Sequence, residues 1–284
     1  MRKLGYLLFL ILYLIPPAGA KARELTNKQI SFPEDTIKLL VTNIDLGVGE
    51  FILNAGNFSD IVRAEVEYND QRVEVYSDYG RKGSTGYLEL GSDFKSKTHI
   101  QSEDNRWKMT LSKKYSTDLS MDFGLCSSDI DLGGIPLKYL NLDIGASESD
   151  LKFSEPNPQI ADEVKIDAGA CKLDIEKLGN ANFRFLKFDG GVGKFTLDFT
   201  GEYKTDSRAD VSIGLGKATI YLPSNLPLRV ESETNFLSSV KFKNERRFDV
   251  KDGFFESLDF SKSDVRLDLK IDVGLGSVDI IWVD

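Results

Sequence analysis

Histidine and cysteine are scarce in this sequence, which limits the chemistry that it can support. The 284 residues include one histidine, His99, and two cysteines, Cys126 and Cys171. A single histidine removes the commonest general base and leaves no pair of histidines to bind a transition metal. No Gly-x-Ser-x-Gly turn is present to carry a nucleophilic serine. We therefore predict no catalytic residue, no cofactor and no metal ligand.

Two features of the sequence come closest to those of an enzyme. Gly190-Gly-Val-Gly-Lys-Phe-Thr has the glycines of a phosphate loop, but Phe188 stands where its first glycine belongs and Phe195 follows the lysine. A glycoside hydrolase stays open as an alternative, because its chemistry needs only two carboxyls at a set separation. With only two tryptophans, however, the stacking platforms for sugar rings would fall mainly to tyrosine and phenylalanine.

Positive charge is in deficit. Lys and Arg number 36 against 45 Asp and Glu, a net charge of −9. Residues 1–20 have the pattern of a cleavable signal peptide and contain two cations and no acid. Without them the chain has 34 Lys and Arg against 45 Asp and Glu, a net charge of −11. Nucleic-acid binding depends on neutralising phosphates, so this balance argues against it. One basic cluster is interpreted as the solvated face of a strand: Lys241, Lys243, Arg246 and Arg247.

Long apolar runs are absent after residue 15. Residues 4–15 form an apolar run of twelve that follows two cations and precedes Ala18-Gly19-Ala20. This pattern predicts a secretory signal peptide over residues 1–20, cleaved after Ala20. The run is shorter than the roughly 20 residues of a membrane-spanning helix. We therefore expect an exported chain, periplasmic or extracellular, with no transmembrane segment after cleavage.

A repeat centred on glycine dominates the rest of the chain. Its seven central glycines are Gly47, Gly124, Gly145, Gly169, Gly191, Gly214 and Gly274. The successive spacings among the middle five are 21, 24, 22 and 23. A fixed period in this range marks an architecture in which each unit buries its apolar face by stacking on its neighbours.

Each copy is expected to be two strands joined by a bend. Counted from the glycine, apolar residues recur at positions −3, −1 and +1, and the apolar phase resumes at +4 and +6. This alternation predicts one inward face, and the change of phase leaves one residue for a bulge. The predicted inward residues at +1 are Val48, Leu125, Ala146, Ala170, Val192, Leu215 and Leu275. Without helical periodicity, the chain is predicted to be all-β, a β-solenoid of stacked rungs of about 22 residues.

The intervals from Gly47 to Gly124 and from Gly214 to Gly274 are much longer than the others and are interpreted as caps over the ends of the stack. The strand-like runs in them are Ile61–Tyr68, Arg72–Tyr76, Tyr87–Leu90, Trp107–Leu111, Leu228–Thr234, Val240–Phe242 and Val265–Leu269. The expected turns of the first interval are Asn69-Asp70, Tyr79-Gly80 and Gly83–Gly86. The predicted divisions are a signal peptide (1–20), an N-terminal segment with its cap (21–120) and a rack with a C-terminal cap (121–284).

Aspartates also recur at fixed places in the repeat. Position −2 holds Asp45, Asp122, Asp143, Asp167, Asp189 and Asp272, and position +5 holds Asp129, Asp150, Asp174 and Asp279. Strands about 4.8 Å apart would align the first set as a column of carboxylates on the outside. Such a column could bind Ca²⁺. The favoured interpretation is that these side chains face solvent and accept hydrogen bonds beside the bend.

The two cysteines occupy the same repeat position with one copy between them. Two steps of the stack separate their Cα atoms by about 9.5 Å, beyond the roughly 7 Å limit of a disulfide. We predict two buried, unpaired thiols.

Several stretches resemble a known family. They are Leu46-Gly-Val-Gly-Glu-Phe, Trp107-Lys-Met-Thr-Leu-Ser, Thr117-Asp-Leu-Ser-Met-Asp-Phe-Gly, Asp143-Ile-Gly-Ala-Ser-Glu-Ser-Asp, Phe153-Ser-Glu-Pro-Asn-Pro, Ile166-Asp-Ala-Gly-Ala-Cys, Leu178-Gly-Asn-Ala-Asn-Phe, Asp189-Gly-Gly-Val-Gly and Leu197-Asp-Phe-Thr-Gly. These stretches resemble the toast-rack family, the β-solenoid module also found in LiaF-like envelope-stress proteins. The resemblance implies a non-enzymatic envelope module, which in some relatives is coupled to stress-responsive signalling. The partner that we expect is an envelope protein or a glycan. The chain departs from the LiaF pattern in lacking membrane-spanning helices.

The sequence thus predicts an exported, non-enzymatic β-rack that presents an interaction surface, with a link to envelope stress implied by the resemblance. Two alternatives stay open. One is a carbohydrate-active β-helix enzyme that uses surface carboxylates, and the other is a calcium-dependent adhesin.

Overall fold

The computed structural model of the chain describes residues 25–95, 101–233, 237–243 and 254–284. Over these residues the chain is almost entirely β-structure, with three short 3₁₀ helices, which confirms the all-β prediction. The predicted signal peptide, His99, Arg246 and Arg247 lie outside the described residues.

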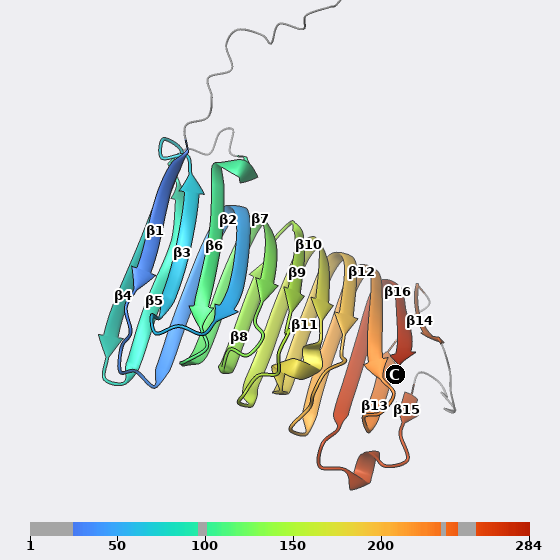
Figure 1. The fold of residues 1–284 in the computed structure, drawn as a ribbon. Helices are drawn as coiled ribbons and strands as arrows, with labels where there is room; N and C mark the ends of the chain where they lie inside the picture. Colours follow the sequence, from blue (N-terminus) through green and yellow to red (C-terminus); the bar gives the residue numbers. More distant parts are fainter. Residues whose placement is uncertain (1–24, 96–100, 234–236, 244–253) are drawn as a thin grey trace, which may run out of the picture.

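The strands form a single sheet among the described residues (Figure 1). They are β1 (Thr26–Phe32), β2 (Leu39–Gly56), β3 (Val62–Tyr68), β4 (Val73–Lys82), β5 (Thr85–Phe94), β6 (Asn105–Ser112), β7 (Ser116–Asp131), β8 (Leu137–Ile144), β9 (Glu148–Lys152), β10 (Ala161–Glu176), β11 (Phe183–Asp198), β12 (Ser207–Pro223), β13 (Leu228–Glu233), β14 (Ser238–Lys243), β15 (Phe254–Glu256) and β16 (Leu267–Val283). The 3₁₀ helices are η1 (Ser102–Asp104), η2 (Leu178–Ala181) and η3 (Phe260–Lys262).

The repeat copies pair side by side as parallel strands. We call β2, β7, β8 with β9, β10, β11, β12 and β16 the parallel stack. Strand β2 pairs with β7, and the order then runs through β8, β10, β11 and β12 to β16. Strands β8 and β9 are the two halves of one repeat copy, and β9 also pairs with β7 and β10. The register aligns equal repeat positions, so Asp143 lies between Asp122 and Asp167. Every repeat position therefore becomes a column of side chains along the stack.

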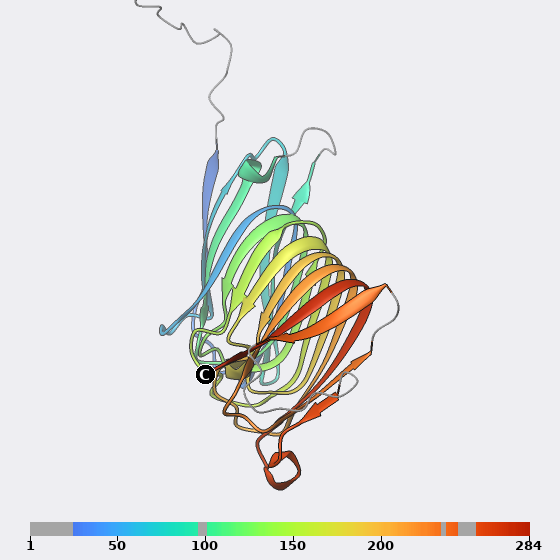
Figure 2. The same cartoon turned by 90° about the vertical axis from the view of Figure 1, so that its right-hand side faces the viewer.

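Each copy bends at its central glycine, and Figure 2 shows the copies as nested arches around a common core. The residues at −3 and −1 point into the arch before the bend, and those at +4 and +6 after it. In the copy of Gly169, Ile166, Leu173 and Ile175 are fully buried. These columns form one continuous hydrophobic core.

The predicted inward orientation of position +1 is wrong. Leu125, Val192, Leu215 and Leu275 occupy this position and are 58%, 51%, 47% and 47% exposed. Both the glycine and the residue after it lie on the outer side of the bend, so alternation breaks there by one residue. Small residues at +2, such as Cys126 and Cys171, point inward and share the phase of +4 and +6 instead.

The close approach of neighbouring copies explains the central glycines. The carbonyl oxygen of Gly124 accepts a hydrogen bond from the N–H of Ala146 (2.8 Å), and that of Gly145 accepts one from Ala170 (2.7 Å). A Cβ added at Gly145 would lie 2.6 Å from the Gly124 oxygen, and one at Gly169 would lie 2.6 Å from the Gly145 oxygen. Because the obstacle is backbone, no rotamer change relieves it, and only glycine fits.

The first interval builds the N-terminal end of the sheet. Strands β1, β3 and β6 pair antiparallel beside the second half of β2, and β5 pairs with its first half. The four predicted strands are present as β3, β4, β5 and β6. The predicted turn at Tyr79-Gly80 is wrong, because β4 stays paired with β5 through Lys82 and turns only at Gly83. The Tyr79 hydroxyl donates to the Asp35 carboxylate at 2.7 Å and holds this part of β4 against the loop before β2.

Buried asparagines hold the connections between copies. The Nδ2 of Asn157 donates to the carbonyls of Leu137 (2.9 Å) and Ala181 (3.0 Å). The Nδ2 of Asn182 donates in turn to the Asn157 carbonyl at 2.8 Å. These amides satisfy backbone groups that the loops would otherwise bury without a partner. They join three successive copies at the side opposite the bend.

The first prediction tests the inward face. Ile175 is fully buried between Leu151 and Leu197 of the adjacent copies. Ile175→Asp should lower the free energy of unfolding by several kcal/mol, because it buries a carboxylate that has no partner. Asp174→Ala removes only an outward ion pair with Lys172 (3.2 Å) and should cost about 0.5 kcal/mol or less. Thermal melts of both variants decide the point, and a larger loss for Asp174→Ala would contradict the assigned face.

The second prediction tests the glycine column. Gly169→Ala should cost about 1–3 kcal/mol, because the new Cβ meets a neighbouring carbonyl oxygen at 2.6 Å. Gly80→Ala is the matched control, since an added Cβ there has no atom within 4 Å. Urea unfolding should show a clear loss for the first variant and a change within about 0.5 kcal/mol for the second. Equal effects would mean that the bend relaxes around a side chain.

Candidate interaction surfaces

The outer face of the bend carries a column of acids, which we call the aspartate column. It consists of Asp45, Asp122, Asp143, Asp167, Asp189 and Asp272, and these side chains lie on the solvent side as predicted. Two of its members are neutralised from their own strand. Lys165 pairs with Asp167, and Lys187 pairs with Asp189. The carboxylates nearer the N-terminal end lack such lysines, because the matching position holds Asn43, Ser120 and Asn141.

The carboxyl pKa differs between members of the aspartate column, because only some of them have a lysine partner. Partial burial raises the pKa of Asp143, and the nearby Asp167 carboxylate adds to the shift although Asn141 donates to Asp143 at 2.7 Å. Burial alone would also raise the pKa of Asp167, but the hydrogen bond and charge of Lys165 outweigh it, so this pKa lies below its usual value. Among the described residues, no three His, Cys, Asp or Glu side chains come together closely enough to hold a metal ion.

Beside the aspartate column runs a line of apolar side chains, which we call the aliphatic ridge. It consists of Val48, Leu125, Ala146, Ala170, Val192, Leu215 and Leu275. A groove of about 590 Å³ follows the central glycines and is bordered by carboxylates of the aspartate column. The sequence held a signal for the ridge. Positions +2, +4 and +6 are two residues apart and therefore share one face of the strand, whereas position +1 lies on the opposite face.

The second aspartate set lies on the other half of each arch and is less uniform. Asp129 and Asp150 are exposed, and Asp174 is half-buried. Asp279 lies between Lys243 (2.8 Å) and Lys217 (3.2 Å). The hydrogen bond from Lys243, followed by that from Lys217, outweighs burial and holds the pKa of Asp279 below its usual value. Lys243, one of the four residues of the predicted basic strand face, thus forms an ion pair with Asp279 of the parallel stack.

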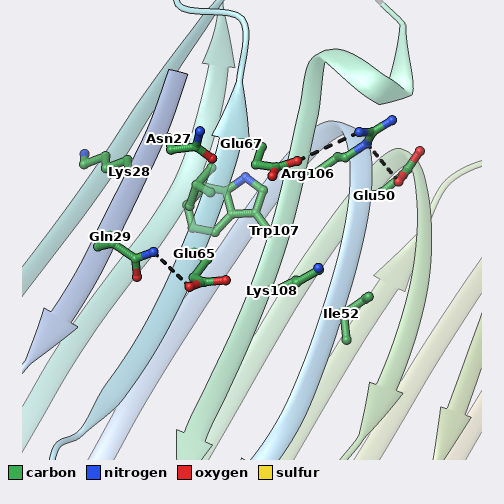
Figure 3. A pocket seen from close by; sticks show the side chains of 11 residues that line it. Asn27, Lys28, Gln29, Glu50, Ile52, Glu65, Glu67, Arg106, Trp107 and Lys108 are labelled. Carbon is green, nitrogen blue, oxygen red and sulfur yellow. Dashed lines mark hydrogen bonds and ion pairs between the residues drawn. The ribbon is translucent and has the colours of Figure 1, made fainter. Parts of the chain in front are cut away.

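A trough of about 380 Å³ lies on the outer face of β1, β3, β6 and the second half of β2 (Figure 3), and we call it the N-terminal trough. Its first cross-strand row is Asn27, Glu67, Arg106 and Glu50. Its second row is Gln29, Glu65, Lys108 and Ile52. The sequence analysis did not find it, because these residues are far apart in the chain and no repeat relates them.

A cleft of about 350 Å³ at the C-terminal end is lined by four arginines: Arg184, Arg208, Arg229 and Arg266. Arg266 donates to both carboxylate oxygens of Asp206, at 3.0 and 3.1 Å, and Arg229 pairs with Glu256 at 2.8 Å. Both guanidinium groups lie over the ring of Phe260, at 4.9 and 4.4 Å. We assign these two arginines to anchoring η3 and β15 on the stack.

The cysteines lie where the repeat predicts. Both are buried and free, and neither forms a disulfide in the described chain. The copy that carries Ser147 lies between them. Burial raises the pKa of the Cys126 thiol to about 12, with a further contribution from Glu50, and burial also raises the pKa of Cys171. The phosphate-loop-like stretch that begins at Gly190 lies inside β11 as a bend of the stack.

Comparison with known proteins agrees with this repeat. The family model for the N-terminal domain of toast_rack (DUF2154) matches residues 21–176 and again residues 157–221, more than half of the chain. The chain belongs to the toast-rack family. The second match begins inside the first, as expected of a sequence whose units resemble one another. No curated protein matches this toast-rack sequence.

Solved structures align with this chain at low sequence identity. A candidate cell adhesion protein from Clostridium sporogenes ATCC 15579 aligns at 19% identity with a TM-score of 0.50, covering 92% of this chain and 100% of its own. A candidate adhesin from Bacteroides fragilis NCTC 9343 aligns at 14% identity with a TM-score of 0.44, covering 91% and 98%. The first likeness supports the fold.

Within the described residues of this toast-rack chain, no helix has the length and apolarity needed to cross a membrane.

The third prediction concerns the thiols. Cys126 and Cys171 should resist Ellman's reagent in the folded toast-rack protein, because a buried thiol with a raised pKa supplies little thiolate. Both should react after unfolding in guanidinium chloride, and the mass of the unreduced protein should fit two free thiols. A mass lower by two hydrogens, together with a cross-linked peptide after digestion, would contradict the order of the copies.

Proposed function

We propose that this toast-rack protein is an exported, non-enzymatic component of the cell envelope that presents an interaction surface to another envelope component. The aliphatic ridge carries the proposal. Leu125, Val192, Leu215 and Leu275 stay about half exposed, although the repeat elsewhere buries its aliphatic residues. Apolar side chains that line up on a surface beside charged groups are typical of a contact with another molecule.

The finer architecture belongs to the same proposal. We infer a β-solenoid in which each repeat copy is one rung, supported by the parallel, in-register pairing of the copies. The division into residues 21–120 and 121–284 follows the change in repeat spacing. Strand β7 (Ser116–Asp131) spans that boundary, so the division describes two patterns of sequence within one continuous sheet.

Export is supported by the apolar run and the small residues before position 21, which together have the form of a signal peptide. The excess of acids disfavours nucleic acid as the partner and leaves an envelope protein or a glycan. A role in the envelope-stress response is a further part of the proposal and follows from the family resemblance. The absence of a catalytic constellation in the sequence supports a non-enzymatic role.

The fourth prediction tests the ridge and export together. When the full chain is produced in a bacterial host, intact mass should place its new N-terminus at Lys21, and part of the protein should sediment with the envelope. Val192→Asp combined with Leu215→Asp should lower the sedimenting fraction at least severalfold, because desolvating two carboxylates opposes any apolar contact.

Thr219→Asp is the matched control, because it adds an acid to β12 on the solvent side but away from the bend. It should leave sedimentation unchanged. An intact mass that still includes the predicted signal peptide would overturn export. Equal sedimentation of the ridge variant and the control would remove the ridge from the interaction surface.

A further inference from the structure

The N-terminal trough alternates hydrogen-bond donors and acceptors across four strands. Glu65 accepts a hydrogen bond from the Gln29 amide at 2.9 Å, and Lys108 stands beside Glu65 on the next strand. In the first row the Arg106 guanidinium lies between Glu50 (3.2 Å) and Glu67 (3.9 Å), as Figure 3 shows. These two contacts leave several of the five guanidinium N–H donors for a ligand.

The charges of the trough favour a neutral ligand. Three carboxylates and three cations line it, so an anion would meet Glu50, Glu65 and Glu67, and a cation would meet Lys28, Arg106 and Lys108. Each hydroxyl group of a ligand donates one hydrogen bond and accepts up to two. A ligand with several adjacent hydroxyls therefore matches carboxylate acceptors that alternate with ammonium, guanidinium and amide donors.

The trough also offers apolar contact. Ile52 is 37% exposed at its edge, and the aliphatic stem of Lys108 lies next to it on the paired strand. Such a surface suits the C–H face of a sugar ring. The volume of about 380 Å³ lies within the range of small-ligand sites and has room for a short part of a longer chain.

We propose that the N-terminal trough binds a neutral glycan through Gln29, Glu65, Arg106 and Lys108. The proposal rests on the proposed function, since the glycan would be one envelope component that the protein contacts. It places this contact on the N-terminal end of the sheet, separate from the aliphatic ridge. The site would be a binding site only, with the sugar chain left intact.

The fifth prediction tests the trough with four neutral trisaccharides: maltotriose, cellotriose, mannotriose and triacetylchitotriose. Each is titrated into ¹⁵N-labelled protein. At least one should shift the amide signals of β3 and β6 with a Kd of about 1 mM or tighter. Lys108→Ala should weaken that binding at least about tenfold. Lys194→Ala is the matched control, an exposed strand lysine away from the trough, and should bind as the wild type does.

Glu65→Gln provides a second variant that keeps the shape of the side chain, and it should also weaken binding. The absence of shifts with all four sugars at about 10 mM would overturn the proposal. So would shifts confined to the bend, or equal binding by Lys108→Ala and Lys194→Ala. Reducing ends are measured in the same samples. Their release would overturn the non-enzymatic function, whereas intact sugars without binding would overturn the glycan site alone.

Discussion

The carbonyl oxygen of one central glycine lies where the Cβ of the next would have to be. At Gly145, Gly169 and Gly191 the separation would be 2.5–2.6 Å, which no side chain tolerates. This contact lets the copies approach closely enough at the bend for their backbones to hydrogen bond there. It also penalises a slip by one residue at Gly145 or Gly169, because the residues on both sides of these glycines carry a Cβ. The glycine column therefore aligns the whole stack.

Alignment turns a short sequence pattern into long columns of side chains. Apolar columns at −3, −1, +4 and +6 close the core, and each inward residue contacts its counterparts in the adjacent copies. The same alignment places like charges one strand apart on the outside, as in the aspartate column. Lys165 and Lys187 offset part of that repulsion from within their own strands. The core and the surface charge pattern thus share one cause.

The candidate surfaces differ in how they arise. The aliphatic ridge and the aspartate column are consequences of the repeat and extend from β2 to β16, with Ser212 in place of the aspartate in β12. The N-terminal trough belongs to the irregular end, where β1, β3 and β6 pair antiparallel beside β2. Its residues come from four separate strands and need not obey the repeat, so the donors and acceptors there are free to vary. A selective site is better suited to this end, and a general contact surface to the ridge.

Local periodicity by itself determined the class of fold, the position of the bend and the neighbours of Ile175 and of the two cysteines. Each of these follows from residues within one copy and from equal spacing between copies. The orientation of Leu125, Leu215 and the other +1 residues was decided by the tertiary structure, because the chain turns around the core and places two consecutive residues outside. The extension of β4 through Tyr79 and Gly80 depended on pairing with β5 and on the contact with Asp35. The trough depended on register between strands with no repeat in common, and only the folded sheet brings those residues together.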